Sequence, residues 1–294
     1  MAGDRPEHYM EVRLEVPRAS ADAVCNFIID HITGGLVLEE EEDSPVTGIL
    51  FYISPDEAED YRSGLVKYLK QILPDGSGTE PEITETIIEN LEWVEEYRKS
   101  VRPIRIADDV VVRPTWETSP EPAKYEIVLE PKMAFGTGSH ETTRSCLKVI
   151  RQTFKPGMRF LDLGCGSGIL SILASKMGAE YILAIDYDVT AIENCRENFS
   201  INAVSTPHDI VFGSVEKADA AEPFDFVCAN IIKSVILPIV DRLIRLTDSG
   251  GVLVLSGLLP PDEAEITEAL RENGQGNFTI MRDNQWLTYI VQKK

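Results

Sequence analysis

The sequence has no uninterrupted run of apolar residues near the roughly 18 that a membrane-spanning helix requires. Its first ten residues, MAGDRPEHYM, lack the apolar core of a secretory signal peptide. The five cysteines are scattered and include no Cys-x-x-Cys pair, which argues against a disulfide framework and against a zinc site. These absences predict a cytoplasmic protein with reduced thiols, no metal and no contact with a membrane.

Basic residues are also scarce, and the net charge is −21. The imbalance is concentrated in residues 1–100, where 8 Lys and Arg face 23 Asp and Glu. An acidic surface repels the nucleic-acid backbone, so we expect no direct binding of DNA or RNA. It attracts basic proteins at long range, although charge alone favours the simpler explanation that it keeps the protein soluble.

The chain is long enough, at 294 residues, for two domains. Residues 1–88 show strand and helix patterns in the order β-α-β-β-α-β, which is that of a small ferredoxin-like α+β domain. Residues 89–130 read as a connecting helix (89–102) and a linker that contains a β-rich segment (104–116) and several prolines. Residues 131–294 then form the second expected domain, in which fully apolar strands alternate with helical stretches. This pattern is typical of a doubly wound α/β fold with a buried parallel sheet.

A glycine-rich turn carries the clearest chemical signal. The apolar strand ending at Leu163 runs into GCGSG (164–168) and then into a helical segment beginning at Ile169. Glycine suits a tight turn that brings backbone close to a ligand. The spacing is GxGxG and not the GxGxxG of dinucleotide enzymes, and no Gly-Lys-Ser/Thr follows, so a P-loop is excluded. Gly164 and Gly166 are therefore predicted to approach a ligand.

Two polar residues end the strands that follow. Asp186 lies 22 positions after Gly164, where a carboxylate can accept hydrogen bonds from ribose hydroxyls. The competing interpretation is a helix cap, a role that Asp188 can fill instead. Asn230 ends the apolar strand of residues 226–229, and its uncharged amide could orient a substrate amine. A turn-forming role for this asparagine is about as well supported by its position.

Glycines and hydroxyls also gather in the run MAFGTGSHETT (133–143), which can approach a ligand or form a mobile polar loop. His140-Glu141 begins like the zinc-protease HExxH motif, but Arg144 stands where the second histidine is needed. Cys165 has no evident base partner and is interpreted as a small packing residue.

These motifs together resemble the PrmA family, bacterial methyltransferases that act on ribosomal protein L11 of the large subunit. The resemblance covers roughly residues 90–294 and rests on EPKMAFGTGSHETT (130–143), LDLGCGSGIL (161–170), AIDYD (184–188), ANII (229–232) and LSGLL (255–259). The glycine turn and the aspartate occur in many methyltransferases, whereas FGTGSHETT paired with ANII is far more specific. The first 90 residues match in pattern only.

The resemblance implies a seven-stranded class I methyltransferase (Rossmann-like) fold, with six strands parallel and the last reversed. It implies S-adenosyl-L-methionine as cofactor, contacted by Thr143, Gly164, Asp186 and Asn230. Gly166, Phe135 and Thr137 complete the predicted cofactor-binding set, and Asn230 is also assigned an orienting role in catalysis. The implied reaction is methyl transfer to lysine ε-amines and an N-terminal α-amine of a basic ribosomal protein, which the N-terminal domain grips.

Two alternatives stay open at this point. A related methyltransferase could act on another protein lysine or on a small molecule. A non-catalytic nucleoside-binding module is a different class, but it need not retain the glycine turn, Asp186 and Asn230 together. No side chain stands out as a catalytic base.

Overall fold

The computed structural model describes residues 8–33, 36–39, 44–53, 58–72, 83–89, 102–119, 122–130, 138–218 and 222–294. The chain divides into two compact units, Met1–Val101 and Arg102–Lys294. Within the described ranges, no helix is both long and apolar enough to cross a membrane.

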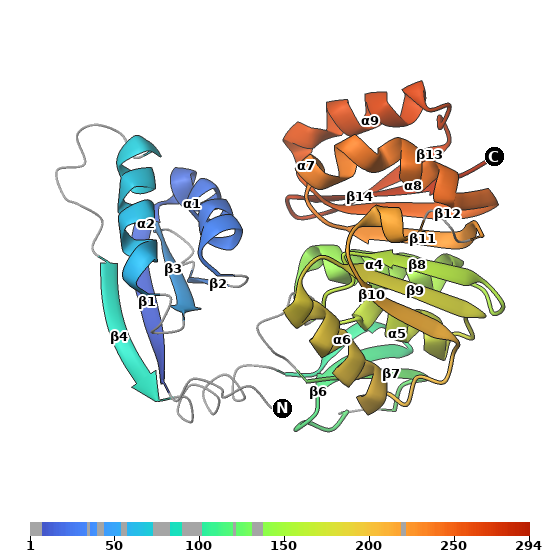
Figure 1. Cartoon of the computed structure of the whole chain (residues 1–294), viewed down its shortest axis with the longest axis horizontal. Coiled ribbons are helices and arrows are strands. Elements are labelled where there is room, and N and C mark those ends of the chain that lie inside the picture. Colours follow the sequence, from blue (N-terminus) through green and yellow to red (C-terminus); the bar gives the residue numbers. More distant parts are fainter. Residues whose placement is uncertain are drawn as a thin grey trace. The chain divides into compact units, whose positions relative to one another are not determined.

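The first unit contains a four-stranded antiparallel sheet covered by two helices (Figure 1). Its elements follow in the order β1 (His8–Pro17), α1 (Arg18–His31), β2 (Leu36–Glu39), β3 (Val46–Ile53), α2 (Ala58–Ile72) and β4 (Ile83–Glu89). The strand order β2-β3-β1-β4, with every neighbouring pair antiparallel, is that of the predicted ferredoxin-like domain. Strand β1 alternates buried Val12, Leu14 and Val16 with outward-facing polar residues, so only one sheet face packs against the helices.

The second unit is built on a seven-stranded sheet of order β10-β9-β8-β11-β12-β14-β13. Its strands are β8 (Arg159–Leu163), β9 (Tyr181–Asp186), β10 (His208–Phe212), β11 (Phe224–Asn230), β12 (Thr247–Leu258), β13 (Phe278–Asp283) and β14 (Trp286–Gln292). The first five in the sheet order pair in parallel, and β14 is antiparallel to both of its neighbours. Six strands therefore run one way and the last in the chain runs the other, which confirms the predicted fold.

Helices cover both faces of this sheet (Figure 1). Helices α4 (Glu141–Thr153), α5 (Ile169–Lys176) and α6 (Val189–Ile201) pack on one face. The opposite face is covered by α7 (Lys233–Ile236), α8 (Val240–Leu246) and α9 (Glu263–Glu272). Burial from both sides explains why strands such as β8 and β9 read as continuous apolar runs in the sequence.

The expected linker of residues 89–130 requires a correction. Residues 104–129 form a separate three-stranded sheet of β5 (Ile104–Ala107), β6 (Val110–Pro114) and β7 (Tyr125–Leu129). Its apolar side chains join the core beneath α4, α5 and α6, so the boundary between units lies near residue 101 and not near 130. The connecting helix is expected from Glu89 to Arg102. Glu89 instead ends β4, and residues 90–101 lie outside the described part of the chain.

Asn198 of α6 and Asn202, which caps the C-terminus of α6, hold this added sheet in place. The Asn202 amide accepts the Val128 N–H at 3.0 Å and donates to the Val128 carbonyl at 2.6 Å. The Asn198 side chain accepts the Glu130 N–H at 2.8 Å and donates to the Ser167 carbonyl at 3.0 Å, within the glycine turn. The end of β7 is thereby tied directly to the predicted cofactor loop.

Candidate functional site

The glycine turn connects β8 to α5, and its three glycine positions do not tolerate a side chain. Gly164, Gly166 and Gly168 have φ angles of +74°, +51° and +78°, which L side chains rarely adopt. A Cβ at Gly164 would lie 2.3 Å from Ile231 Cγ2, and one at Gly168 would lie 2.7 Å from Cys195 Sγ. The turn is therefore packed closely against Ile231 and Cys195, and its contact with a ligand stays a prediction.

Asp186 ends β9 beside this turn and is only 7% exposed. Its Oδ2 accepts the Gly166 N–H at 2.8 Å, and its Oδ1 accepts the Asp188 N–H at 3.0 Å. Burial raises the pKa of this carboxyl, and the two backbone N–H groups oppose that effect. Asp188, and not Asp186, caps α6 by accepting the Thr190 N–H at 2.8 Å. The geometry thus removes the competing cap interpretation, while the contact of Asp186 with cofactor stays a prediction.

The structure brings Thr143 and Asn230 together from positions 87 residues apart in the chain. Asn230 ends β11, and Thr143 is buried in the first turn of α4. The Asn230 Nδ2 donates to Thr143 Oγ1 at 3.5 Å. Strand β11 pairs with β8 at the point where the strand order reverses, and ligands bind at such switch points in open α/β sheets. Phe135 and Thr137, the remaining predicted contacts, lie outside the described residues.

A contact that the sequence did not reveal fixes the start of α4. His140 caps the helix through its Nδ1, which accepts the Thr142 N–H at 3.3 Å. Its ring packs edge-on against the ring of Trp286, with 4.8 Å between the ring centroids. Burial lowers the pKa of His140. Asn284, in the turn between β13 and β14, donates to Glu141 at 3.3 Å. The C-terminal hairpin thereby supports the turn that presents Thr143, a contact that only the folded chain brings together.

Asp162 is a second residue beside the site that the sequence motifs did not indicate. It lies in β8 two residues before the glycine turn and is completely buried. Its Oδ2 accepts the Ser171 hydroxyl at 2.6 Å, whereas Oδ1 has no hydrogen-bond partner among the described residues. Burial raises the pKa of Asp162 to about 7. The sequence feature that could have identified it is an aspartate between Leu161 and Leu163 in an otherwise apolar strand.

The described cysteines and histidines provide neither an activated nucleophile nor a metal site. Cys165 is buried and hydrogen-bonded to Cys195, a contact that raises the pKa of the Cys165 thiol well above its usual value. A protonated, buried thiol is a poor nucleophile, in keeping with a packing role. Across the described ranges, no cluster of three or more His, Cys, Asp or Glu residues could hold a metal ion.

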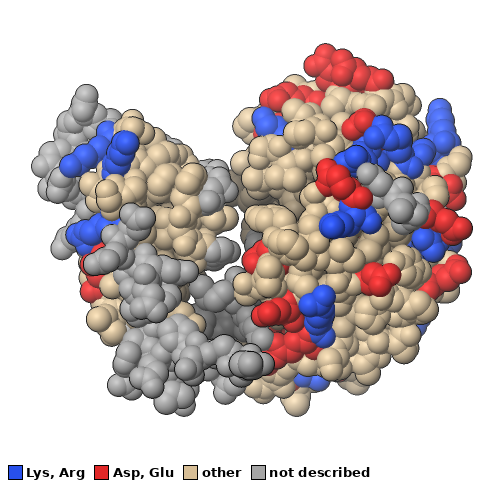
Figure 2. Space-filling model, viewed as in Figure 1, with Lys and Arg blue, Asp and Glu red and all other residues tan. Residues whose placement is uncertain are grey.

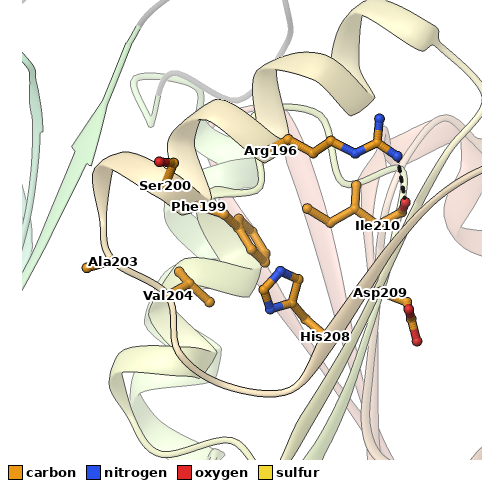
Figure 3. A pocket seen from close by; sticks show the side chains of 8 residues that line it. All are labelled: Arg196, Phe199, Ser200, Ala203, Val204, His208, Asp209 and Ile210. Carbon is orange, nitrogen blue, oxygen red and sulfur yellow. Dashed lines mark hydrogen bonds between the residues drawn. The ribbon is translucent and has the colours of Figure 1, made fainter.

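A hollow of about 600 Å³ lies beside the edge strand β10, and none of the predicted cofactor contacts lines it (Figure 3). Its walls come from α6 and β10 and include Arg196, Phe199 and His208. Arg196 already donates to the Ile210 carbonyl at 3.2 Å, and His208 Nδ1 lies 2.7 Å from the Thr206 carbonyl. With these polar groups engaged and none of the predicted contacts present, the hollow is not assigned as the cofactor site.

Comparison with known proteins identifies the family of this chain. The family model described as "Ribosomal protein L11 methyltransferase (PrmA)" matches residues 8–294. A ribosomal protein L11 methyltransferase of a Nitratiruptor species is 33% identical over 97% of this chain and 96% of its own length. Another, from Caldicellulosiruptor saccharolyticus, is 30% identical over 97% of this chain and 99% of its own length.

A solved structure extends the agreement to the fold. The ribosomal protein L11 methylase of Lactobacillus delbrueckii subsp. bulgaricus superposes with a TM-score of 0.59 and 27% identity, covering 65% of this chain and 98% of that one. This structure supports the same family as the two full-length relatives. The chain therefore belongs to the ribosomal protein L11 methyltransferase (PrmA) family, whose members are S-adenosylmethionine-dependent protein methyltransferases.

Proposed function

We propose that this enzyme methylates ribosomal protein L11, on lysine ε-amines and on the N-terminal α-amine. The observation that carries the proposal is the pairing of Asn230 with Thr143 at the sheet's switch point, beside the glycine turn. The full-length relatives whose names specify this substrate support the choice of acceptor. A ribosomal protein as acceptor also favours a cytoplasmic location and a basic partner.

The residues present fit S-adenosylmethionine. Gly164 and Gly166 hold the turn beside Asp186 at φ angles that only glycine adopts readily, and Asp186 offers a buried carboxylate for ribose hydroxyls. Thr143 and Asn230 would border the opposite side of the same site. When bound, the cofactor supplies a methyl group that is already activated on a sulfonium, so the protein contributes position and electrostatics.

Asn230 is suited to align the acceptor amine. Because its Nδ2 is directed to Thr143 Oγ1, its Oδ1 is the amide atom left to accept a hydrogen bond from the amine. A lysine amine of pKa about 10.4 is mostly protonated at pH 7 and must lose a proton before it attacks. Exclusion of water lowers that pKa, so the neutral amine can form without a dedicated base.

The acidic first unit would hold the acceptor. Its 23 Asp and Glu in residues 1–100 outnumber Lys and Arg by 15, which suits a basic protein and disfavours direct contact with nucleic acid. The same division keeps cofactor binding within the second unit, where every described candidate residue lies.

The test is methyl transfer itself. The protein is incubated with isotopically labelled S-adenosylmethionine and purified L11, and the labelled sites are located by mass spectrometry. Label on L11 lysines and on its N-terminal amine supports the proposal. Label on a different ribosomal protein, with L11 unmodified in the same mixture, would transfer the function to another acceptor. Replacing Asn230 by Ala should abolish labelling while leaving the protein folded.

A further inference from the structure

A half-satisfied carboxyl lies directly behind the cofactor loop. Asp162 pairs in register with Cys228 of β11 and with Ala184 of β9, so its side chain enters the apolar core beneath α4 and α5. Only Oδ2 is hydrogen-bonded, to the Ser171 hydroxyl at 2.6 Å. The buried Oδ1 has no hydrogen-bond partner in the described part of the chain. An ionised carboxylate is costly in such a place unless a positive charge compensates it.

The groups that face Asp162 do not supply that charge. The Asp186 carboxyl on β9 repels a negative charge on Asp162 and so raises its pKa. The remaining titratable groups around it are thiols of the glycine turn, α4, α6 and β11, namely Cys165, Cys146, Cys195 and Cys228. No cation contributes to the ionisation of Asp162 within the described ranges. Burial and Asp186 together bring its pKa to about 7, against the Ser171 hydrogen bond.

The two ligands that alternate in this site differ by one positive charge. S-adenosylmethionine carries a sulfonium, and the product left after methyl transfer carries a neutral thioether. A positive charge brought into a site of low dielectric favours ionisation of a nearby carboxyl. The product lacks the sulfonium charge, so its binding stabilises the ionised form of Asp162 less.

We propose that the positive charge of the bound ligand controls whether the Asp162 carboxyl is protonated. It is protonated in the ligand-free protein, releases its proton to solvent when S-adenosylmethionine binds, and takes one up again when only the product remains. Asp162 acts through the glycine turn and the field within the site, and is a positioning and electrostatic residue. The coupling favours the methyl donor over the product as the pH rises, because the donor complex is the deprotonated one.

Linkage fixes the direction and the size of the effect. A ligand that releases a proton binds more tightly as pH rises between the pKa of the complex and that of the free protein. Each unit by which the donor lowers the pKa of Asp162 strengthens binding by up to tenfold at high pH. We expect the affinity for S-adenosylmethionine to rise by about tenfold from about pH 6 to pH 8 on this account.

Calorimetry measures the proton directly. The full-length protein is titrated with S-adenosylmethionine and, separately, with the product, at about pH 6.8 in buffers of different ionisation enthalpy. The slope of the observed heat against that enthalpy gives the protons exchanged. Both ligands carry an α-amine that titrates near pH 8, so the diagnostic quantity is the difference between parent and Asp162→Asn. With S-adenosylmethionine, we expect the parent to release about half a proton more per ligand bound than Asp162→Asn. With the product, we expect the parent and Asp162→Asn to release the same number of protons.

A matched control uses the same chemical change elsewhere on the sheet. Asp225 begins β11 at the opposite end of the strands, where its Oδ2 accepts the Arg159 N–H at 2.8 Å. Asp225→Asn should leave the proton count of the parent unchanged. An equal loss of proton release in both variants would overturn the assignment to Asp162.

Infrared spectroscopy provides a test that does not depend on a variant folding. The unmodified protein should show the carbonyl stretch of a buried protonated carboxyl near pH 6.5, which lies below the pKa of about 7. This band should vanish on addition of S-adenosylmethionine and persist with the product. A band that is absent from the ligand-free protein, or that responds equally to both ligands, would refute the proposal.

Discussion

The two units of this protein differ in how they are built and in what they carry. The second unit packs its sheet between helices on both faces, and its candidate residues lie at strand ends and in the first turn of a helix. The first unit covers only one face of its sheet, yet it holds most of the net charge. Figure 2 shows acidic and basic side chains interspersed on the visible face of the second unit. Rigid, buried elements thus accompany the chemistry, and unbalanced charge accompanies the proposed recognition of the acceptor.

The strongest test separates the units physically. A fragment beginning at Arg102 retains the whole second unit, including the three-stranded sheet that a cut near residue 130 would destroy. We expect it to bind S-adenosylmethionine normally and to lose methylation of the protein acceptor by at least about a hundredfold, or about 3 kcal/mol of binding energy. Calorimetry and a methyl-transfer assay measure the two properties, with circular dichroism to verify folding. A folded fragment that still methylates the acceptor at the parent rate would show that the first unit is not the recognition element.

A second test concerns neighbouring carboxylates within the cofactor unit. Asp186→Ala removes an acceptor of the Gly166 N–H and the predicted partner of the ribose, so cofactor affinity should fall by roughly 10- to 100-fold, or about 1.5–3 kcal/mol. Asp188→Ala is the matched control, because it removes only the cap of α6 and should cost about 1 kcal/mol of stability. Equilibrium dialysis for affinity and thermal unfolding for stability distinguish them. Equal loss of affinity in both variants would mean that the helix start, and not the Asp186 carboxylate, supports binding.

Much of this division was accessible from the sequence. The alternation of apolar strands with helices predicts the doubly wound sheet, because burial from both faces requires continuous apolar runs. The glycine spacing locates the loop between β8 and α5, where positive φ angles demand glycine. The prolines at 120, 122 and 131, in contrast, suggested a linker where the chain forms β5, β6 and β7. That sheet is stabilised by tertiary contacts with α6, which no local pattern reveals.

The candidate site shows the same limit. Asp186 and Asn230 could be named because strand ends meet at one edge of a parallel sheet. Their actual contacts, with Gly166 and Thr143, depend on register and on the placement of α4. Asp162 was missed because its neighbours make the strand look uniformly apolar, although a carboxyl in that position is the anomaly. The support of His140 by Trp286 joins residues far apart in the chain and has no local signature.

A third prediction concerns stability and applies to the second unit alone. The pKa of Asp162 is about 7 in the folded protein and about 3.9 when unfolded, so stability falls as pH rises from about 4 to 7. Asp162→Asn should therefore stabilise the ligand-free protein at about pH 8, by about 1–2 kcal/mol after the cost of its own unpaired amide. At about pH 5 the folded parent keeps its proton and most of the loss has not yet accumulated, so the advantage of Asp162→Asn should be lower by roughly 2–3 kcal/mol and Asp162→Asn should be the less stable protein. Thermal unfolding at both pH values tests this, and Asp225→Asn should show no such pH-dependent gain.

The smallest expected effect tests whether the acidic excess of the first unit recognises the acceptor. Five consecutive acidic residues, Glu39 to Asp43, are replaced by their amides, which removes five negative charges from that unit. Long-range attraction to a basic acceptor is worth a few tenths of a kcal/mol per charge, so KM for the acceptor should rise by roughly fivefold at low salt. The turnover number and cofactor affinity should stay at the parent values. At about 1 M salt, where screening shortens to about 3 Å, parent and variant should become alike.

The control for this last variant keeps the change in charge and moves it to the other unit. Amide substitutions are made at five exposed acidic positions of the second unit, namely Glu180, Glu222, Asp248, Glu268 and Glu272. Overall net charge is then identical in the two variants, and only its location differs. If location matters, KM for the acceptor rises in the first variant and not in the second, because steering depends on the local field at the docking surface. An equal rise in KM in both variants would show that the total charge alone attracts the basic substrate. The first unit would then have no specific role in recognition.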